Sequence, residues 1–207
     1  MTNPSNQGPA SGLDVLSAHV SSLQESLSAL DLVTLQQAGE LIDENCLRGH
    51  TVFCLGNGGS AATASHIATD LFWGRRMSGE PRPRAVSLVS NVPLMTALAN
   101  DVNYDEVFVE QLRGQFREGD MIVAVSASGN SPNVVKAAEF AKEFGGTSVG
   151  LVGFDGGALK DRCNVSVHVA TPPGAYELVE DVHHAVCHML AGYLKHKAQL
   201  RAQGGTR

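Results

Sequence analysis

Two apolar segments of the chain each end in a turn rich in glycine and serine, and a helical pattern follows each turn. This repeated order of strand, turn and helix is typical of a parallel sheet covered by helices on both faces. Three weaker strands show the same order, so we expect five. The two strong units are 51–55 before Gly56-Asn57-Gly58-Gly59-Ser60, and 121–125 before Ser126-Ala127-Ser128-Gly129-Asn130-Ser131; the weaker strands lie near 85–89, 148–152 and 165–169.

The pattern predicts one α/β domain, a three-layer αβα sandwich with a five-stranded parallel sheet, preceded by two N-terminal helices. Leucines and a valine at helical spacing between Leu13 and Leu27 mark the first helix, and the second runs from about Asp31 to Leu47. We expect a disordered tail at 1–12, the domain at 13–198 and a polar tail at 199–207.

Composition restricts the class of function. The chain of 207 residues carries 21 acidic and 15 basic residues, a formal charge of −6. It lacks the basic excess that displaces counterions from DNA, so we expect no nucleic-acid partner. No apolar run approaches about 18 residues, which argues against a membrane span. Four cysteines without a CxxC pair predict buried, reduced thiols and a cytoplasmic protein.

Both turns lie where open α/β sheets bind ligands, after a strand and before a helix. Glycine allows close approach of the backbone, and the free N–H groups at a helix start attract a phosphate. The alternative is that the turns are only structural and the serines only cap helices. Gly56, Gly58 and Ala61 also fit a loosened dinucleotide motif, but no acid follows the next strand to hold a ribose. A single phosphoryl group is therefore the favoured ligand.

Imidazoles and carboxylates are the second candidate feature. His66 and Asp70 stand at i and i+4, so they share one helix face. On the last helix, acids and imidazoles fall within an arc of about 100°, opposite an apolar arc. A solvated face is the default interpretation, whereas a metal site needs this ligand chemistry. The members of the arc are Glu177, Glu180, Asp181, His184 and His188.

These two turns, with Asn100-Asp101 and Phe154-Asp155-Gly156-Gly157, closely resemble the sugar isomerase (SIS) domain family over about residues 35–197. Within that family the chain looks most like enzymes acting on heptose phosphates. The resemblance implies conversion of sedoheptulose 7-phosphate to D-glycero-D-manno-heptose 7-phosphate through a metal-assisted enediolate. It also implies a phosphorylated sugar as ligand and a homotetramer with active sites near subunit interfaces.

The resemblance implies roles for individual residues as well. Asp70 is the expected base and His188 its partner acid or a metal ligand. One Zn²⁺ per subunit would be held by a four-residue set, and the turn residues would bind the phosphate and sugar. The metal set is His66, Asp70, Glu180 and His188; the substrate set is Asn57, Gly58, Gly59, Ser60, Asp101, Ser126, Ser128, Ser131, Glu177 and Glu180.

The chain departs from the family pattern at four positions, three of them in these sets. Asp70 is one methylene shorter than the family Glu, and Glu180 is charged where the family has an amide. Glu177 replaces an Asp and Ala127 a Thr. Glu180 and His188 are separated by about 12 Å along one helix, at roughly 1.5 Å per residue. Both can bind one metal only if their side chains lean together or if one of them comes from a neighbouring chain. We therefore expect a site near a subunit interface.

Two non-catalytic readings stay open. Proteins of this fold also act as sugar-phosphate sensors or as scaffolds that bind the replication initiator. The four-residue set of His66, Asp70, Glu180 and His188 favours an enzyme, because a scaffold has no need to keep such groups together.

Overall fold

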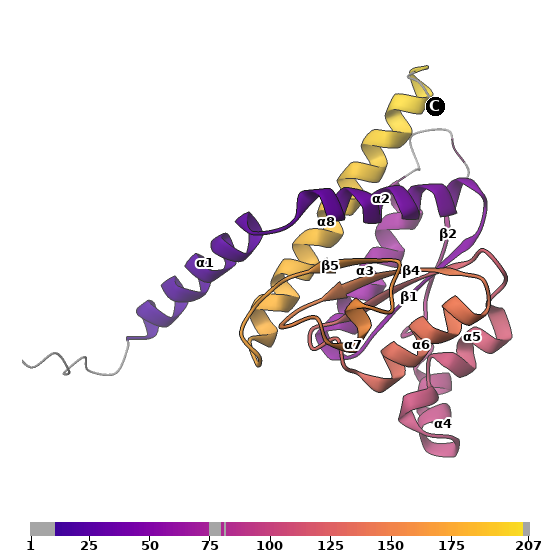
Figure 1. Ribbon diagram of the computed structural model, residues 1–207, viewed down its shortest axis with the longest axis horizontal. Helices are drawn as coiled ribbons and strands as arrows, with labels where there is room; N and C mark the ends of the chain where they lie inside the picture. The colour runs from indigo at the N-terminus through magenta and orange to yellow at the C-terminus, as the bar shows by residue number, and fades with distance from the viewer. Residues whose placement is uncertain (1–10, 75–79, 81, 205–207) are drawn as a thin grey trace, which may run out of the picture.

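The computed structural model describes residues 11–74, 80 and 82–204 of the chain (Figure 1). Most of the predicted tail at 1–12 lies outside the described residues. The strands are β1 (Thr51–Gly56), β2 (Arg84–Ser87), β3 (Met121–Ser126), β4 (Thr147–Val152) and β5 (Val165–His168). The helices are α1 (Gly12–Ser28), α2 (Leu32–Leu47), α3 (Gly58–Gly74), α4 (Val92–Asp101), the 3₁₀ turn η1 (Tyr104–Glu106), α5 (Val109–Gln115), α6 (Pro132–Glu143), α7 (Gly157–Lys160) and α8 (Tyr176–Ala202).

The five strands form one parallel sheet in the order β2-β1-β3-β4-β5, as predicted. β1 and β3 are neighbours, and Gly56 pairs in register with Val125. The turns that follow these two strands therefore leave the sheet side by side at its carboxyl edge. This adjacency places both predicted phosphate turns at one site.

Alternate residues of each strand face opposite helix layers, because side chains alternate along a strand. Val52 and Cys54 pack in the core formed with α2, α3 and α8, whereas Phe53 and Leu55 pack in the core with α5, α6 and α7. Burying a side chain such as Phe53 contributes about 1.5–3 kcal/mol. The predicted three-layer sandwich is confirmed.

The cysteines are all reduced thiols, as expected, although only Cys54 and Cys187 are fully buried. None of the helices in the described part of the chain is long and apolar enough to cross a membrane.

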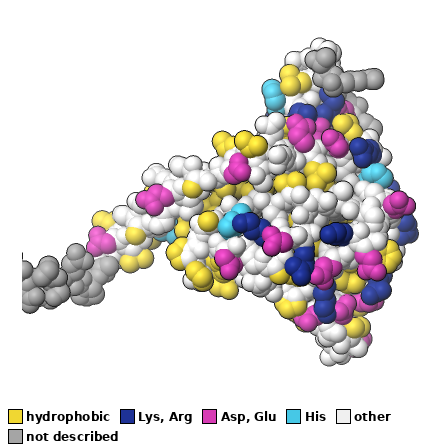
Figure 2. All heavy atoms as spheres, viewed as in Figure 1, with side chains coloured by type: hydrophobic (Ala, Val, Ile, Leu, Met, Phe, Trp, Pro, Cys, Tyr) yellow, Lys and Arg dark blue, Asp and Glu magenta, His cyan; other side chains and the backbone are white. Residues whose placement is uncertain are grey.

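Helix α1 projects from the sandwich as an arm (Figure 1). Its start is well defined, because Ser11 and Asp14 form a reciprocal capping box. Leu23 and Leu27 pack against the core, but Leu13 and Leu16 are 72% and 67% exposed. The apolar stripe predicted from the sequence is therefore only partly covered, and Figure 2 shows hydrophobic side chains along the arm.

Helix α8 runs beside α3 and forms one wall of the molecule. It continues to Ala202, four residues past the boundary expected at 198. Leu194 and Ala198 remain buried near its end. The segment expected to be a polar tail is therefore helical as far as Ala202.

Candidate active site

The two glycine- and serine-rich turns line one cavity of about 150 Å³ at the carboxyl edge of the sheet. Ser60 and Ser126 are 5% and 4% exposed, so their hydroxyls are enclosed rather than solvated. Helix α8 adds the remaining wall. The lining residues are Asn57, Ser60, Val125, Ser126, Ala127, Ser128, Ser131, Tyr176 and Glu180.

The first turn is held by a pair of amide side chains. The Asn57 Nδ2 donates to Asn133 Oδ1 at 2.9 Å, and the Asn133 Nδ2 donates back to Asn57 Oδ1 at 3.0 Å. The Tyr104 hydroxyl also donates to Asn57 Oδ1 at 2.9 Å. Because Asn133 is only 1% exposed and belongs to α6, it ties the first turn to the helix that the second turn opens.

The second turn is shaped by its own hydroxyls. The Gly129 N–H donates to Ser126 Oγ at 3.1 Å, and the Oγ atoms of Ser126 and Ser131 lie 3.3 Å apart. Gly129 has φ +63°, and a β-carbon there would strike the Gly156 carbonyl. The Leu159 N–H donates to the Gly129 carbonyl at 2.8 Å, so the Gly156-Gly157 segment supports this turn.

Ser131 occupies the N-cap position of α6, but within the described residues its side chain makes no capping hydrogen bond. This observation weakens the alternative that the serine serves only to cap the helix. Its hydroxyl is turned toward Ser126 and the cavity instead.

Glu180 reaches the cavity from α8. Its carboxylate lies directly over Gly59, where a β-carbon would overlap it. Partial burial raises the pKa of Glu180, and the negative charges of Glu177 and Asp181 raise it further. The carboxyl group therefore takes and releases a proton closer to neutral pH than an exposed glutamate does.

Further along the same two helices, three imidazoles meet. His66 of α3 and His188 of α8 have Nε2 atoms 3.1 Å apart. The ring centroid of His184 lies 4.7 Å from that of His66 and 5.0 Å from that of His188. Ligand atoms of all three residues lie within 4.8 Å of one another.

A second group shares His66. The Asp70 Oδ2 lies 3.2 Å from His66 Nε2, and the Cys187 Sγ is 3.8 Å from the same carboxylate oxygen. Burial raises the pKa of Cys187 to about 12, so this thiol keeps its proton at neutral pH in the metal-free chain. Among the described residues these two groups are the sets that could hold a metal ion, and Glu180 belongs to neither.

The donors fit a divalent transition metal. Tetrahedral Zn²⁺ with Zn–N bonds of about 2.0–2.1 Å separates its nitrogen ligands by about 3.3 Å. The His66–His188 separation of 3.1 Å is close to this value. Three imidazoles with ligand atoms this close together are a ligand set that zinc accepts.

The structure thus divides the residues expected from the sequence. The turn residues and Glu180 surround one cavity, and His66, Asp70 and His188 gather beyond it. Four expected substrate residues are not among the described residues lining that cavity: Gly58 and Gly59 of the first turn, Asp101, exposed at the end of α4, and Glu177, exposed in the first turn of α8. His184 was absent from the expected metal set, although its i, i+4 spacing to His188 signalled it. Asn133 carried no comparable sequence signal.

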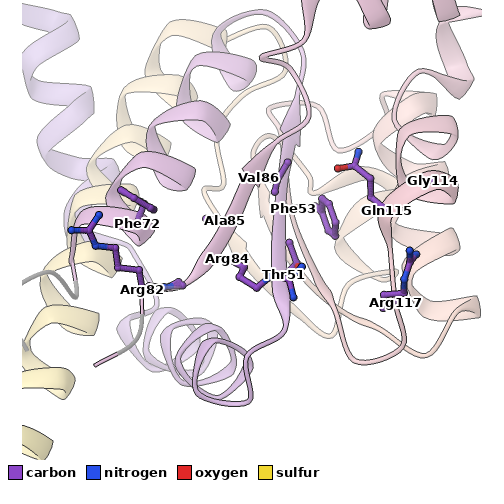
Figure 3. A pocket seen from close by; sticks show the side chains of 11 residues that line it. Thr51, Phe53, Phe72, Arg82, Arg84, Ala85, Val86, Gly114, Gln115 and Arg117 are labelled. Carbon is purple, nitrogen blue, oxygen red and sulfur yellow. The ribbon is translucent and has the colours of Figure 1, made fainter. Parts of the chain in front are cut away.

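A larger hollow of about 570 Å³ lies beside the edge strand β2, away from these groups (Figure 3). Phe53 and Phe72 line it together with the exposed arginines Arg82, Arg84 and Arg117. It shares no lining residue with the serine cavity in the described part of the chain. The candidate site is therefore the smaller serine cavity, because polar side chains converge on it, and not the larger hollow beside β2.

Residues 17–153 match the SIS domain family. Phosphoheptose isomerase of Nitratidesulfovibrio vulgaris (strain Hildenborough) is 39% identical over 149 residues, which cover 72% of this chain and 70% of the relative. Phosphoheptose isomerase of Desulfovibrio desulfuricans is 35% identical over 191 residues, covering 89% and 90%. The structure of phosphoheptose isomerase from Neisseria gonorrhoeae superposes with a TM-score of 0.77 at 29% identity, covering 88% of this chain and 95% of that one.

The fold, with both glycine- and serine-rich turns at one edge of the parallel sheet, is that of an SIS domain, and the chain belongs to the SIS domain family. Within it the chain is an aldose–ketose isomerase of the sugar-phosphate class, similar to the phosphoheptose isomerases. This result favours the enzyme over the sensor and scaffold alternatives.

Proposed function

We propose that the chain converts sedoheptulose 7-phosphate to D-glycero-D-manno-heptose 7-phosphate. The observation that carries the proposal is the meeting of two serine turns and one carboxylate around a single cavity, with an imidazole cluster adjoining it. The names of the relatives at 35–39% identity support the heptose substrate.

The serine turns bind the phosphate in this proposal. Hydroxyls of Ser60, Ser126 and Ser131 and the backbone N–H groups at the start of α3 supply donors to an anion. Because the turns are fixed by the Asn57–Asn133 pair and by Gly156-Gly157, they hold the phosphate at a set distance from the reacting carbons. Asn57 contacts a sugar hydroxyl, as do Asp101 and Glu177 once the site is completed by a neighbouring subunit.

The imidazole cluster holds the metal. His66, His184 and His188 are its ligands in this proposal, and the Asp70 carboxylate holds the His66 ring in orientation. A bound Zn²⁺ would supply a Lewis acid for the sugar carbonyl oxygen. The chain's own part of the chemistry is to move a proton between C1 and C2, which requires a partly desolvated base.

A homotetramer completes the site. The exposed apolar residues of α1 support this, since Leu13, Leu16 and Val20 are each more than half exposed in a single chain. An arm with such a stripe is stabilised when a second copy covers it. The cavity of about 150 Å³ is also small for a seven-carbon sugar phosphate, so a neighbouring chain would enclose the rest.

The test is direct. Purified protein is incubated with sedoheptulose 7-phosphate and followed by ¹³C and ³¹P NMR, with unphosphorylated sedoheptulose as control. We expect a heptose 7-phosphate from the first and no product from the second. Failure to isomerise five- to seven-carbon ketose phosphates, with zinc bound, would overturn the proposal.

A further inference from the structure

We infer that Tyr104 is a positioning residue for the sugar phosphate. Its hydroxyl fixes the amide of Asn57 so that this side chain offers the cavity a hydrogen-bond donor. The inference rests on the proposed isomerase function and deepens it at the same site. Tyr104 is not among the described residues that line the cavity, so it acts on the ligand through Asn57.

The hydrogen bonds of Asn57 leave one of its groups free. A side-chain amide has two acceptor sites on its oxygen and two N–H donors on its nitrogen. Both acceptor sites of Asn57 Oδ1 are used, because the Tyr104 hydroxyl donates at 2.9 Å and Asn133 Nδ2 donates at 3.0 Å. One N–H of Asn57 donates to Asn133 Oδ1 at 2.9 Å. The other makes no hydrogen bond within the described residues, so it is available to an oxygen atom of a ligand in the cavity.

Tyr104 decides which end of the Asn57 amide faces the cavity. Two amides that pair with each other can both turn over, exchanging oxygen for nitrogen, and still keep their two mutual hydrogen bonds. Turned over, Asn57 would present an oxygen to the cavity and would repel the oxygen atoms of a sugar phosphate. The phenol is a better donor than acceptor, because its oxygen is conjugated with the ring, so Tyr104 favours the orientation in which Asn57 Oδ1 faces the hydroxyl.

Helix α6 holds both partners of Asn57 in place. Asn133 belongs to its first turn and is 1% exposed. Lys136, three residues later on the same helix, donates from Nζ to Glu106 Oε1 at 2.6 Å. Glu106 belongs to η1, the 3₁₀ turn that also carries Tyr104. The ion pair therefore keeps η1 against α6 and the Tyr104 hydroxyl within reach of Asn57.

This arrangement gives a role to the segment that follows Asp101. The family resemblance included Asn100-Asp101, yet Asp101 is exposed and is not among the described residues lining the cavity. Tyr104, three residues further on, does reach a lining residue. Within a single chain the segment therefore acts on the cavity through the Tyr104 hydroxyl.

The alternative is that Tyr104 only anchors η1 to the first turn. Its side chain is 52% exposed, so its ring contributes little apolar burial, and the hydroxyl is the group with a specific partner. An anchor would change the unfolding free energy of the protein without a selective effect on ligand affinity. A positioning residue changes the affinity, and its effect depends on the presence of the Asn57 amide.

The first experiment is Tyr104→Phe, which removes the hydroxyl and keeps the ring. We expect KM for sedoheptulose 7-phosphate to rise about fivefold while kcat stays within about twofold of wild type, as loss of one neutral hydrogen bond predicts. Tyr193→Phe is the matched control, because it removes a hydroxyl that donates to Glu40 between α8 and α2. This control should keep the wild-type kcat and KM.

A double-mutant cycle shows whether Tyr104 acts through Asn57. Asn57→Ala should raise KM more than Tyr104→Phe does, and the double variant should match Asn57→Ala alone. Effects of the two substitutions that multiply independently would overturn the inference. An unchanged KM in Tyr104→Phe would overturn it as well, and so would a loss in kcat at constant KM.

Ligand affinity separates this inference from the proposed function. Isothermal titration calorimetry gives the dissociation constant of sedoheptulose 7-phosphate for the wild type, both single variants and the double variant. If the wild type binds this sugar phosphate but turns over no ketose phosphate, the isomerase proposal fails, and the affinities still decide the role of Tyr104 by the same cycle. A wild type that neither binds nor converts it would overturn both.

Discussion

His66 Nε2 lies 3.1 Å from His188 Nε2, although 122 residues separate them in the sequence. Two imidazole nitrogens at this distance share either a proton or a cation. His184 offers a third imidazole, and the ligand atoms of all three residues lie within 4.8 Å of one another. This geometry makes the metal the first property to measure.

We predict about one zinc ion per chain, held by the three imidazoles. His184→Ala should weaken zinc binding at least about tenfold, because it removes a nitrogen ligand that the family-based set did not include. Elemental analysis and competition with a chelating dye measure this. Glu180→Gln is the control and should bind zinc as wild type does. Equal affinities for His184→Ala and wild type would exclude His184 as a ligand.

The serine hydroxyls should contribute to phosphate binding. Ser126→Ala removes an enclosed donor and is expected to raise KM for the ketose phosphate about tenfold, as loss of a charge-assisted hydrogen bond does. Inhibition by inorganic phosphate should weaken in parallel. Ser166→Ala, on β5 outside the cavity, is the matched control. An unchanged KM in Ser126→Ala would mean that the phosphate binds elsewhere.

Acid should destabilise the fold through His183. Burial lowers the pKa of His183 to about 4, partly offset by the Val152 backbone, and nearby His168 lowers it further. An unfolded histidine has a pKa of about 6.5, so above that pH neither state is protonated and stability is undiminished. Between pH 6.5 and 4 the unfolded chain binds a proton that the folded chain does not. Stability should fall there by up to about 3 kcal/mol.

Urea unfolding from pH 8 to 4 measures this effect. His183→Gln, which cannot titrate, should show a shallower decline of the unfolding free energy with falling pH. His50→Gln replaces a partly exposed histidine and should keep the wild-type slope. Identical slopes in the wild type and His183→Gln would show that another group is responsible.

The exposed stripe of α1 should control assembly. Leu16→Glu places a charge on a side chain that is 67% exposed in a single chain, so the isolated fold tolerates it. Covered by another copy, however, the charge would be desolvated without a partner. Light scattering should give a mass near one or two chains instead of four. Ala18→Glu, on the opposite side of the helix, should remain tetrameric, and an unchanged mass for Leu16→Glu would refute the role of the arm.

Local sequence determined the sheet and the phosphate turns, because apolar strands, glycine turns and helix starts are short-range features. The strands lie within a few residues of their expected bounds. Helical periodicity also placed Glu180, His184 and His188 on one face of α8. These properties follow from residues close together in the chain.

Only the tertiary structure decided which residue of α3 meets which residue of α8. Periodicity defines a face, but the offset between two packed helices depends on how their buried side chains fit together. That offset sets Glu180 over Gly59 and His188 beside His66, about two helical turns apart on α8. The four residues grouped from the sequence are therefore divided in the structure. Glu180 lies at the cavity, whereas His66, Asp70 and His188 lie together beyond it.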